Sequence, residues 1–483
     1  MLRLTRGPAV LAVLAVLASL SAGVLAGCDN SAAPVQWNFT LSHVSPSNGQ
    51  MAGGKLLRLV GTNFPNRIDS VRVGSQRLSG VTRKEASAID GIVPGVSEPG
   101  IHDVTLYTSA GDTTCRGCYR YNPPVTWRSI VAGGSHSCSL ESRGFAYCWG
   151  DNTIGQLGQE SWPGGPDWCD EPNEYFNLTL LNCSGAPLAV AGGIPFESLS
   201  AGSSHTCGLV ISGQTYCWGH NGYGQLGDGS NNDRRAPVRV GPPTFSSLNS
   251  GRFHTCGLTN EGAAYCWGSN FEFALGNGSS VDRNTPGQVA GGLVFVSLAA
   301  GDSFTCGLTS LGAAYCWGSN RDGQLGDQST RNRGAPGLVL GDVKYVSIIA
   351  GAYHACGLTT AGAAYCWGMN GYGQLGDGST TNRGIPVATG GSHTFIQLTA
   401  GAYHTCGLQS AGTVLCWGGW IGRYVTPVPV SGGPLFASIH GGGFHTCGLG
   451  VDNSAWCWGE NNRHQLGDGS RVAHYQAVAV QKP

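Results

Sequence analysis

The feature of this 483-residue sequence that most limits its fold is a cysteine pair that recurs seven times with one spacing. In every pair the cysteines are ten residues apart, and a residue that tolerates positive φ follows the first cysteine by six positions. A hairpin whose three-residue loop runs from Ser310 to Gly312 places Cys306 directly opposite Cys316, within reach of a disulfide. The pattern therefore predicts seven cross-strand disulfides, Cys138–Cys148, Cys207–Cys217, Cys256–Cys266, Cys306–Cys316, Cys356–Cys366, Cys406–Cys416 and Cys447–Cys457.

The cysteine pairs belong to a longer internal repeat. The intervals between successive unit starts are 69, 49, 50, 50, 50 and 41 residues. A representative unit, Phe295 to Leu340, contains four short β-like segments separated by Gly, Asn and Asp turns. Seven such units predict a β-propeller, and the strand from Tyr475 to Val480 is expected to complete the first blade and close the ring. The units start at Trp127, Phe196, Phe245, Phe295, Tyr345, Phe395 and Phe436.

Three motifs recur within these units. They read AGxxHTCGL, YCWGxNxxGQLGDGS and APVxV, and GQLG itself occurs at 155–158, 224–227, 323–326 and 373–376. Over about residues 124–483 the repeat resembles that of the regulator of chromosome condensation family. This resemblance implies a seven-bladed β-propeller, which agrees with the number of units counted from the spacing.

Residues 1–27 have the features of a secretion signal. Arg3 and Arg6 precede an apolar stretch that is short for a membrane span. Residues 25–28 read Leu-Ala-Gly-Cys, which resembles the lipobox of bacterial lipoproteins, so Cys28 is the expected lipidation site. An ordinary secretory signal is the alternative. We expect an extracytoplasmic protein of the bacterial cell envelope, held at the inner or the outer membrane by its lipid anchor only.

A second domain is expected between a linker at 28–40 and the repeats. Residues 41–122 contain alternating segments such as LLRLVG and SVRVG, and they resemble the immunoglobulin-like IPT/TIG domain. We expect a local structural disulfide between Cys115 and Cys118, because the βαβ setting of a redox CxxC is absent. The expected fold class is thus all-β, a seven-bladed β-propeller at 124–483 with a small N-terminal immunoglobulin-like β-sandwich.

A histidine recurs at one place in six units, and Phe304 occupies that place in the remaining unit. Imidazole can ligate a metal or act as an acid or a base. A residue repeated once per blade is nevertheless expected to serve the hydrogen bonding of the repeat, and the Asp of each GDGS turn is assigned to turn chemistry. No cofactor and no metal site are expected. The histidines are His136, His205, His254, His354, His404 and His445.

Two regions that break the repeat are candidates for binding a partner. Unit one carries an acidic insertion around 159–185, in which a Cys169–Cys183 bridge is expected to hold aromatic anchors in place. The residue before the repeated histidine is aromatic in four units, which could form an arc on one rim, with packing between blades as the alternative. The candidates are Trp162, Trp168, Tyr175 and Phe176 in the insertion, and Phe253, Tyr353, Tyr403 and Phe444 on the rim.

The charge balance limits the choice of function. With 27 Lys plus Arg against 28 Asp plus Glu, no electrostatic footprint for nucleic acid is visible. We predict a noncatalytic receptor, adaptor or inhibitor whose partner is another exported or surface protein. The alternative is an extracytoplasmic hydrolase or lyase acting on polysaccharide or peptide in the channel, although the repeated polar residues lack an asymmetric acid/base cluster.

Overall fold

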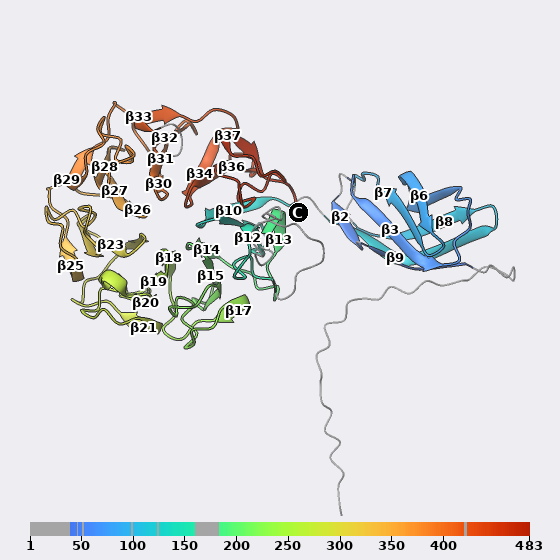
Figure 1. Ribbon diagram of the computed structural model, residues 1–483, viewed down its shortest axis with the longest axis horizontal. Helices are drawn as coiled ribbons and strands as arrows, with labels where there is room; N and C mark the ends of the chain where they lie inside the picture. The colour runs from blue at the N-terminus through green and yellow to red at the C-terminus, as the bar shows by residue number, and fades with distance from the viewer. Residues whose placement is uncertain are drawn as a thin grey trace, which may run out of the picture. The chain divides into compact units, whose positions relative to one another are not determined.

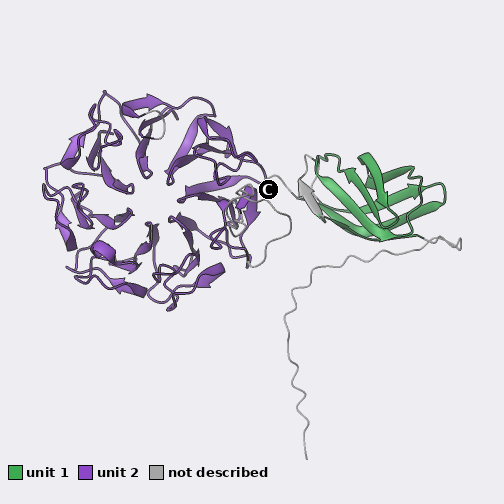
Figure 2. Cartoon of the chain, in the orientation of Figure 1, with its two compact units in different colours: residues 1–124 green, residues 125–483 purple. Residues whose placement is uncertain are grey.

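The computed structural model describes residues 39–45, 47–50, 53–97, 100–122, 125–159, 183–419 and 423–483. The chain divides into two compact units, residues 1–124 and 125–483 (Figure 2). Over the described ranges every element is a β-strand except the short 3₁₀ helix η1 (Phe271–Phe273), which confirms the all-β prediction. None of the helical structure found in these ranges has the length and apolar character needed to cross a membrane.

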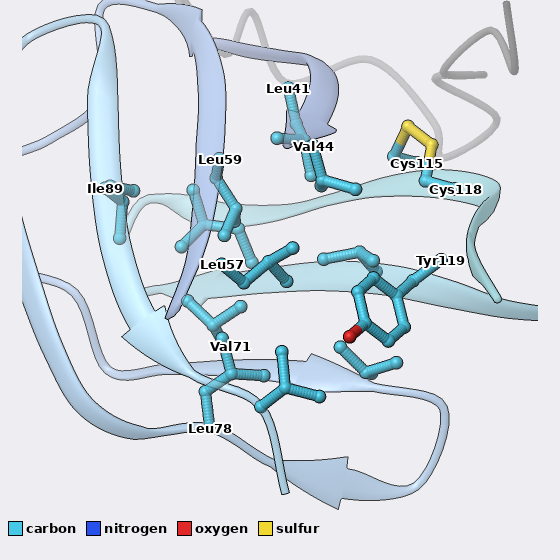
Figure 3. Close-up of a cluster of buried hydrophobic side chains, with 14 of the residues drawn as sticks. Leu41, Val44, Leu57, Leu59, Val71, Leu78, Ile89, Cys115, Cys118 and Tyr119 are labelled. Atoms are coloured by element: carbon cyan, nitrogen blue, oxygen red, sulfur yellow. A yellow bond between two sulfur atoms is a disulfide. The ribbon is translucent and has the colours of Figure 1, made fainter. Parts of the chain in front are cut away.

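The first unit consists of two sheets around one core (Figure 3). Side chains alternate along a strand, so Leu57 and Leu59 of β3 are buried while Leu56 and Arg58 are exposed. One sheet has the order β1 (Thr40–Ser45), β3 (Leu56–Thr62), β7 (Ala88–Ile92) and β6 (Ser79–Glu85). The other has the order β2 (Asn48–Gln50), β9 (Gly111–Asn122), β8 (Gly100–Thr108), β4 (Ser70–Val73) and β5 (Gln76–Arg77).

Strand β9 bulges at the CxxC sequence. The residues between Cys115 and Tyr119 stand opposite the single residue Asp103 of β8, whose carboxylate accepts a 2.7 Å hydrogen bond from the Gly117 N–H. Cys115 and Cys118 are disulfide-bonded across this bulge, and both are buried against the core (Figure 3). The bridge therefore lies inside a sheet of the first unit.

The second unit contains seven four-stranded antiparallel sheets, which we call blades 1 to 7 in chain order. Figure 1 shows them arranged around a central axis with the first strand of each blade innermost. The predicted propeller architecture is confirmed. The strands are β10 (Trp127–Ala132), β11 (His136–Glu141), β12 (Ala146–Asp151) and β13 (Cys183–Ala189) in blade 1; β14 (Ser198–Ala201), β15 (His205–Leu209), β16 (Thr215–Gly219) and β17 (Arg234–Arg239) in blade 2; β18 (Ser247–Ser250), β19 (His254–Leu258), β20 (Ala264–Gly268) and β21 (Arg283–Gln288) in blade 3; β22 (Ser297–Ala300), β23 (Phe304–Leu308), β24 (Ala314–Gly318) and β25 (Arg333–Leu338) in blade 4; β26 (Ser347–Ala350), β27 (His354–Leu358), β28 (Ala364–Gly368) and β29 (Arg383–Ala388) in blade 5; β30 (Gln397–Ala400), β31 (His404–Leu408), β32 (Val414–Gly418) and β33 (Tyr424–Pro429) in blade 6; and β34 (Phe436–Gly441), β35 (His445–Gly450), β36 (Ala455–Gly459) and β37 (His474–Ala479) in blade 7.

The prediction for ring closure is wrong. Strand β37 pairs with β36 of its own blade, and blade 1 has its own fourth strand in β13. The insertion of unit one separates β13 from the rest of its unit, which hides this strand in the sequence. Side chains join blades 7 and 1 instead: His445 Nε2 lies 2.8 Å from Ser137 Oγ, and Trp149 Nε1 donates to the Gln465 carbonyl over 3.0 Å.

The cysteine hairpins have the predicted register. Cys306 lies directly opposite Cys316, and Gly312, with a φ of +75°, closes the turn by donating its N–H to the Thr309 carbonyl over 2.9 Å. Each of the seven pairs is disulfide-bonded at a Cα separation of 4.0 to 4.1 Å, near the short spacing of a non-hydrogen-bonded cross-strand pair.

The repeated histidines join neighbouring blades. His205 Nε2 lies 2.9 Å from Oγ1 of Thr255 in the next blade, and the Thr255 hydroxyl donates to the Gln225 carbonyl over 2.9 Å. Because that hydroxyl proton is already used, the imidazole donates, and it is the neutral Nε2–H tautomer. Equivalent contacts occur at six interfaces, which confirms the structural role of the histidines. The other pairs are His136–Thr206, His254–Thr305, His354–Thr405, His404–Thr446 and His445–Ser137.

At the seventh interface both partners are replaced together. Phe304 of blade 4 occupies the histidine position, and Ala355 of blade 5 occupies the threonine position. Both residues are fully buried in one apolar cluster. Because the donor and the acceptor are lost as a pair, neither is left buried without a partner. The interface between these two blades is therefore apolar where the others are polar.

A ring of glycines lines the central channel, which encloses a cavity of about 410 Å³. A Cβ atom on Gly351 would overlap both the carbonyl oxygen of Gly401 in the next blade and the ring of His354. The close approach of neighbouring blades at the axis therefore requires glycine at this position.

We expect Gly351→Ala to destabilise the propeller by about 2 to 3 kcal/mol, because the backbone of the next blade has to move. Gly371→Ala is the matched control, since a Cβ there meets only Met369 Cε at 3.8 Å. Urea unfolding followed by tryptophan fluorescence measures both changes in free energy. Equal stability of the two variants would contradict the close packing of the glycine ring.

Candidate functional site

One end of the channel carries residues that differ from blade to blade. In each blade, the turn between the first and second strands and the loop between the third and fourth strands emerge at the same end of the sheet. The predicted rim residues lie in the first of these turns. Tyr353, Tyr403 and Phe444 line the channel mouth together with Arg252 and Asp302.

Three of the four predicted rim aromatics form a continuous row. The rings of Tyr353 and Tyr403 are stacked with centroids 5.8 Å apart and planes inclined by 30°, and the Phe444 ring centroid lies 5.8 Å from that of Tyr403. Tyr372, from the loop between β28 and β29, packs on Tyr403 with a centroid distance of 4.6 Å. We call Tyr353, Tyr372, Tyr403 and Phe444 the aromatic rim. All four rings are half-buried, so they pack between blades and also present a face to solvent.

Phe253 is separate from this row, because Ser303 of blade 4 lies between it and Tyr353 in the order of blades. Its ring contacts Tyr223, with centroids 5.2 Å apart, and the Arg252 guanidinium lies 4.9 Å from its centroid. The predicted arc is therefore divided into a row on blades 5 to 7 and an isolated aromatic on blade 3.

The predicted site residues did not include Tyr372, Tyr223 or Arg423. The Arg423 guanidinium lies 5.8 Å from the Tyr372 ring centroid. Both tyrosines occupy the variable positions of the NxxGQLG loop, between the repeated Asn and the following Gly. The sequence could have indicated both tyrosines, because a position that varies inside an otherwise repeated loop holds a residue that the repeat itself does not need.

The remaining predicted site residues lie away from the aromatic rim or outside the described residues. Cys183 is disulfide-bonded and begins strand β13. Its expected partner Cys169 lies outside the described residues, as do the lipidation candidate Cys28 and the insertion residues Trp162, Trp168, Tyr175 and Phe176.

The charged groups of this face are paired across blades. Arg252 Nη1 lies 3.2 Å from Asp302 Oδ2, and the Asp302 side chain is 10% exposed. Burial, followed by the charge of Asp302, raises the pKa of Tyr353 to about 12, so this hydroxyl is protonated at neutral pH.

The GDGS carboxylates are used within their own turns. Asp228 accepts hydrogen bonds of 2.9 Å from the Ser230 N–H and the Arg234 Nε, as predicted for turn chemistry. Among the residues that the structure describes, no cluster of three His, Cys, Asp or Glu side chains is arranged to hold a metal ion.

Two family models of the regulator of chromosome condensation (RCC1) repeat match the chain. One matches residues 127–156, 196–225, 245–273, 295–324 and 345–374, and the other matches 212–258, 261–308, 312–358 and 361–408. Together they cover half of the sequence. The chain belongs to the RCC1 repeat family.

Curated relatives share only part of this RCC1-repeat chain. The probable E3 ubiquitin-protein ligase HERC4 of Homo sapiens is 34% identical over 108 residues, which are 22% of this chain and 9% of HERC4. The human E3 ubiquitin-protein ligase HERC2 is 30% identical over 112 residues, 23% of this chain and 2% of HERC2. The matched segment therefore covers less than a tenth of the length of each of these relatives.

Solved structures share the fold of the RCC1-repeat region. Human WBSCR16 superposes with a TM-score of 0.61 at 20% identity, covering 70% of this chain and 94% of WBSCR16. Prp20p from Saccharomyces cerevisiae superposes with a TM-score of 0.58 at 20% identity, covering 74% of this chain and 87% of Prp20p. At this level of identity the similarity shows the propeller fold.

Proposed function

We propose that this chain is a lipid-anchored, noncatalytic, protein-binding propeller of the bacterial cell envelope. In this proposal a signal peptide at 1–27 precedes lipidated Cys28 and a linker at 28–40. An IPT/TIG-like sandwich at 41–122 then connects to a closed seven-bladed propeller at 124–483. The observation that carries the proposal is the aromatic rim, a row of half-exposed rings on turns of a rigid scaffold.

Aromatic anchors on rigid loops are typical of protein interfaces, because they contribute a large contact area at a small cost in conformational entropy. The buried disulfides indicate an oxidising, extracellular environment, so the partner is expected to be another exported or surface protein. The Prp20p structure was described together with binding to Gsp1p and histones. We transfer from it only the general property of protein binding, and we propose the insertion aromatics Trp162, Trp168, Tyr175 and Phe176 as a second contact region.

The test is position-specific photocrosslinking in the cell that makes the protein. We expect benzoylphenylalanine at position 403 to give a discrete adduct, and the same residue at Leu311 to give none. Leu311 is 81% exposed but lies in the hairpin turn at the other end of blade 4. With the adduct identified, Tyr403→Ala should weaken binding by about tenfold or more. Identical adducts at both positions, or none at position 403, would reject the proposal.

A further inference from the structure

A second cavity, of about 630 Å³, opens on the same end of the propeller across blades 2 to 5. Phe253, Phe271 and Tyr353 form part of its wall, and Phe271 is 67% exposed. A volume of this size is in the range of ligand pockets in proteins. Phe271 thus gives the cavity an aromatic face that is accessible from solvent, whereas Phe253 already contacts the Arg252 guanidinium and Tyr353 is stacked on Tyr403.

The charged residues that line this cavity are predominantly acidic. Arg252 and Arg321 are the two cations, and both are already in ion pairs, with Asp302 and Glu272 respectively. Asp282 and Asp322 complete the charged lining, which gives four carboxylates against two guanidinium groups. The lining therefore carries a formal charge of −2.

The carboxylate of Asp302 has a polar partner of normal geometry at only one of its two oxygens. Its Oδ2 faces Arg252, whereas its Oδ1 is buried and accepts no hydrogen bond of normal geometry from the described residues, although the Tyr353 hydroxyl lies near enough to interact with this carboxylate. The side chain is 90% buried, and the carboxylate can turn about χ2, a broad two-fold torsion that exchanges the two oxygens. A donor entering the cavity could therefore complete the coordination of this carboxylate, which otherwise keeps an unsatisfied buried acceptor.

The backbone beside the cavity adopts a strained conformation at Glu272 and Phe273. Their φ angles are +60° and +68°, whereas the Gly323 equivalent of Phe273 has a φ of +82° without a side chain. Positive φ at two consecutive non-glycine residues costs conformational free energy, and such strain concentrates at binding sites. Here it holds the Glu272 carboxylate, 10% exposed, against the cavity.

We infer that this cavity binds a cationic side chain, lysine or arginine, supplied by the protein partner; the inference rests on the proposed protein-binding function. Aromatic faces attract a cation through their quadrupole, and the excess carboxylates attract it by charge. A neutral hydroxyl or amide could donate to Asp302 Oδ1 but would leave the formal charge of −2 uncompensated, and an anion would be repelled by that charge. The partner is therefore recognised by one basic side chain here and by apolar contacts at the aromatic rim.

The test uses saturation-transfer difference NMR on the full chain, with Nα-acetyl-arginine amide and Nα-acetyl-lysine amide as probes. Nα-acetyl-citrulline amide is the control probe, because it keeps the shape of arginine without the charge. We expect signals from the arginine or lysine side-chain methylenes, about tenfold weaker for citrulline, because charge-assisted hydrogen bonds are the stronger ones. These signals should decrease as salt is raised from 25 to about 500 mM.

Asp302→Asn should abolish the arginine and lysine signals, whereas Asp342→Asn, which removes an exposed carboxylate outside the cavity, should leave them unchanged. Unfolding temperatures of both variants exclude loss of fold, and Glu272→Gln provides a second variant if Asp302→Asn is unstable. Equal signals from citrulline, or no signal from the wild-type chain, would overturn the inference. No saturation-transfer signal from either cationic probe, together with a specific adduct at position 403, would reject the cation pocket and leave the protein-binding function standing. Signals from the cationic probes without an adduct at position 403 would reject the protein-binding function, and with it a protein partner as the source of the cation.

Discussion

Reduction of the seven blade disulfides is expected to leave the propeller unable to fold. Each bridge joins cysteines ten residues apart, which is worth about 2 to 3 kcal/mol in the chain-entropy model. Seven bridges together contribute about 15 to 20 kcal/mol, more than the net stability of roughly 5 to 15 kcal/mol of a typical domain. The reduced chain therefore lacks the constraint that makes the folded ring favourable.

The blade cysteines are fully buried in the folded state, so a reductant reaches them only after the chain has been unfolded. The chain is reduced in denaturant, the denaturant is removed with reductant still present, and near-UV circular dichroism and tryptophan fluorescence are compared with the oxidised chain. The seven fully buried tryptophans at the blade interfaces report the fold directly. A reduced chain that regains the oxidised spectrum and its unfolding transition would contradict the prediction.

Two paired variants make this result specific. Cys356→Ala with Cys366→Ala should lower the unfolding free energy of the propeller by about 2 to 3 kcal/mol. Cys115→Ala with Cys118→Ala is the matched control, because that bridge lies in the first compact unit and should leave the propeller transition unchanged. A propeller transition that responds equally to both pairs would contradict a blade-local role for the disulfides.

The hairpins and the histidine positions could be predicted from the sequence, because they depend on contacts within one unit or on a repeated partner. The fourth strand of blade 1 could not, because an insertion separates it from its unit. The contact of Tyr372 with Tyr403 was also missed, since it joins two different loops of neighbouring blades. The pairing of Arg252 with Asp302 is similar: both occupy the same place in successive units, and only the ring geometry makes them neighbours.

The propeller is expected to lose stability steeply as the pH falls below about 6.5. Burial lowers the pKa of the repeated histidines to about 3 or 4 in the folded chain, whereas in the unfolded chain they titrate near 6.5. Between these values the unfolded chain binds more protons than the folded one, so stability is present at neutral pH and is lost on acidification. Each histidine contributes up to about 1.4 kcal/mol per pH unit, and six contribute about 8 kcal/mol per pH unit at the steepest point.

The native pair Phe304 and Ala355 shows which substitution can test this prediction, because it fills the histidine and threonine positions of one interface with apolar side chains. His205→Phe with Thr255→Ala copies it at another interface. The Gln225 carbonyl still accepts the Trp267 Nε1–H over 3.0 Å after Thr255 is removed, so no buried acceptor is left without a donor.

We expect this double variant to reduce the slope of unfolding free energy against pH, between about pH 6.5 and 4.5, by roughly 1.4 kcal/mol per pH unit, with a small change at pH 8. Thr255→Ala alone is the control, because it keeps the titrating histidine and removes only its hydrogen-bond partner. The control should lower stability by about 1 kcal/mol over the whole range and leave the slope intact. Urea unfolding at a series of pH values measures both quantities. An unchanged slope in the double variant would show that the buried imidazoles do not control the acid sensitivity of the ring.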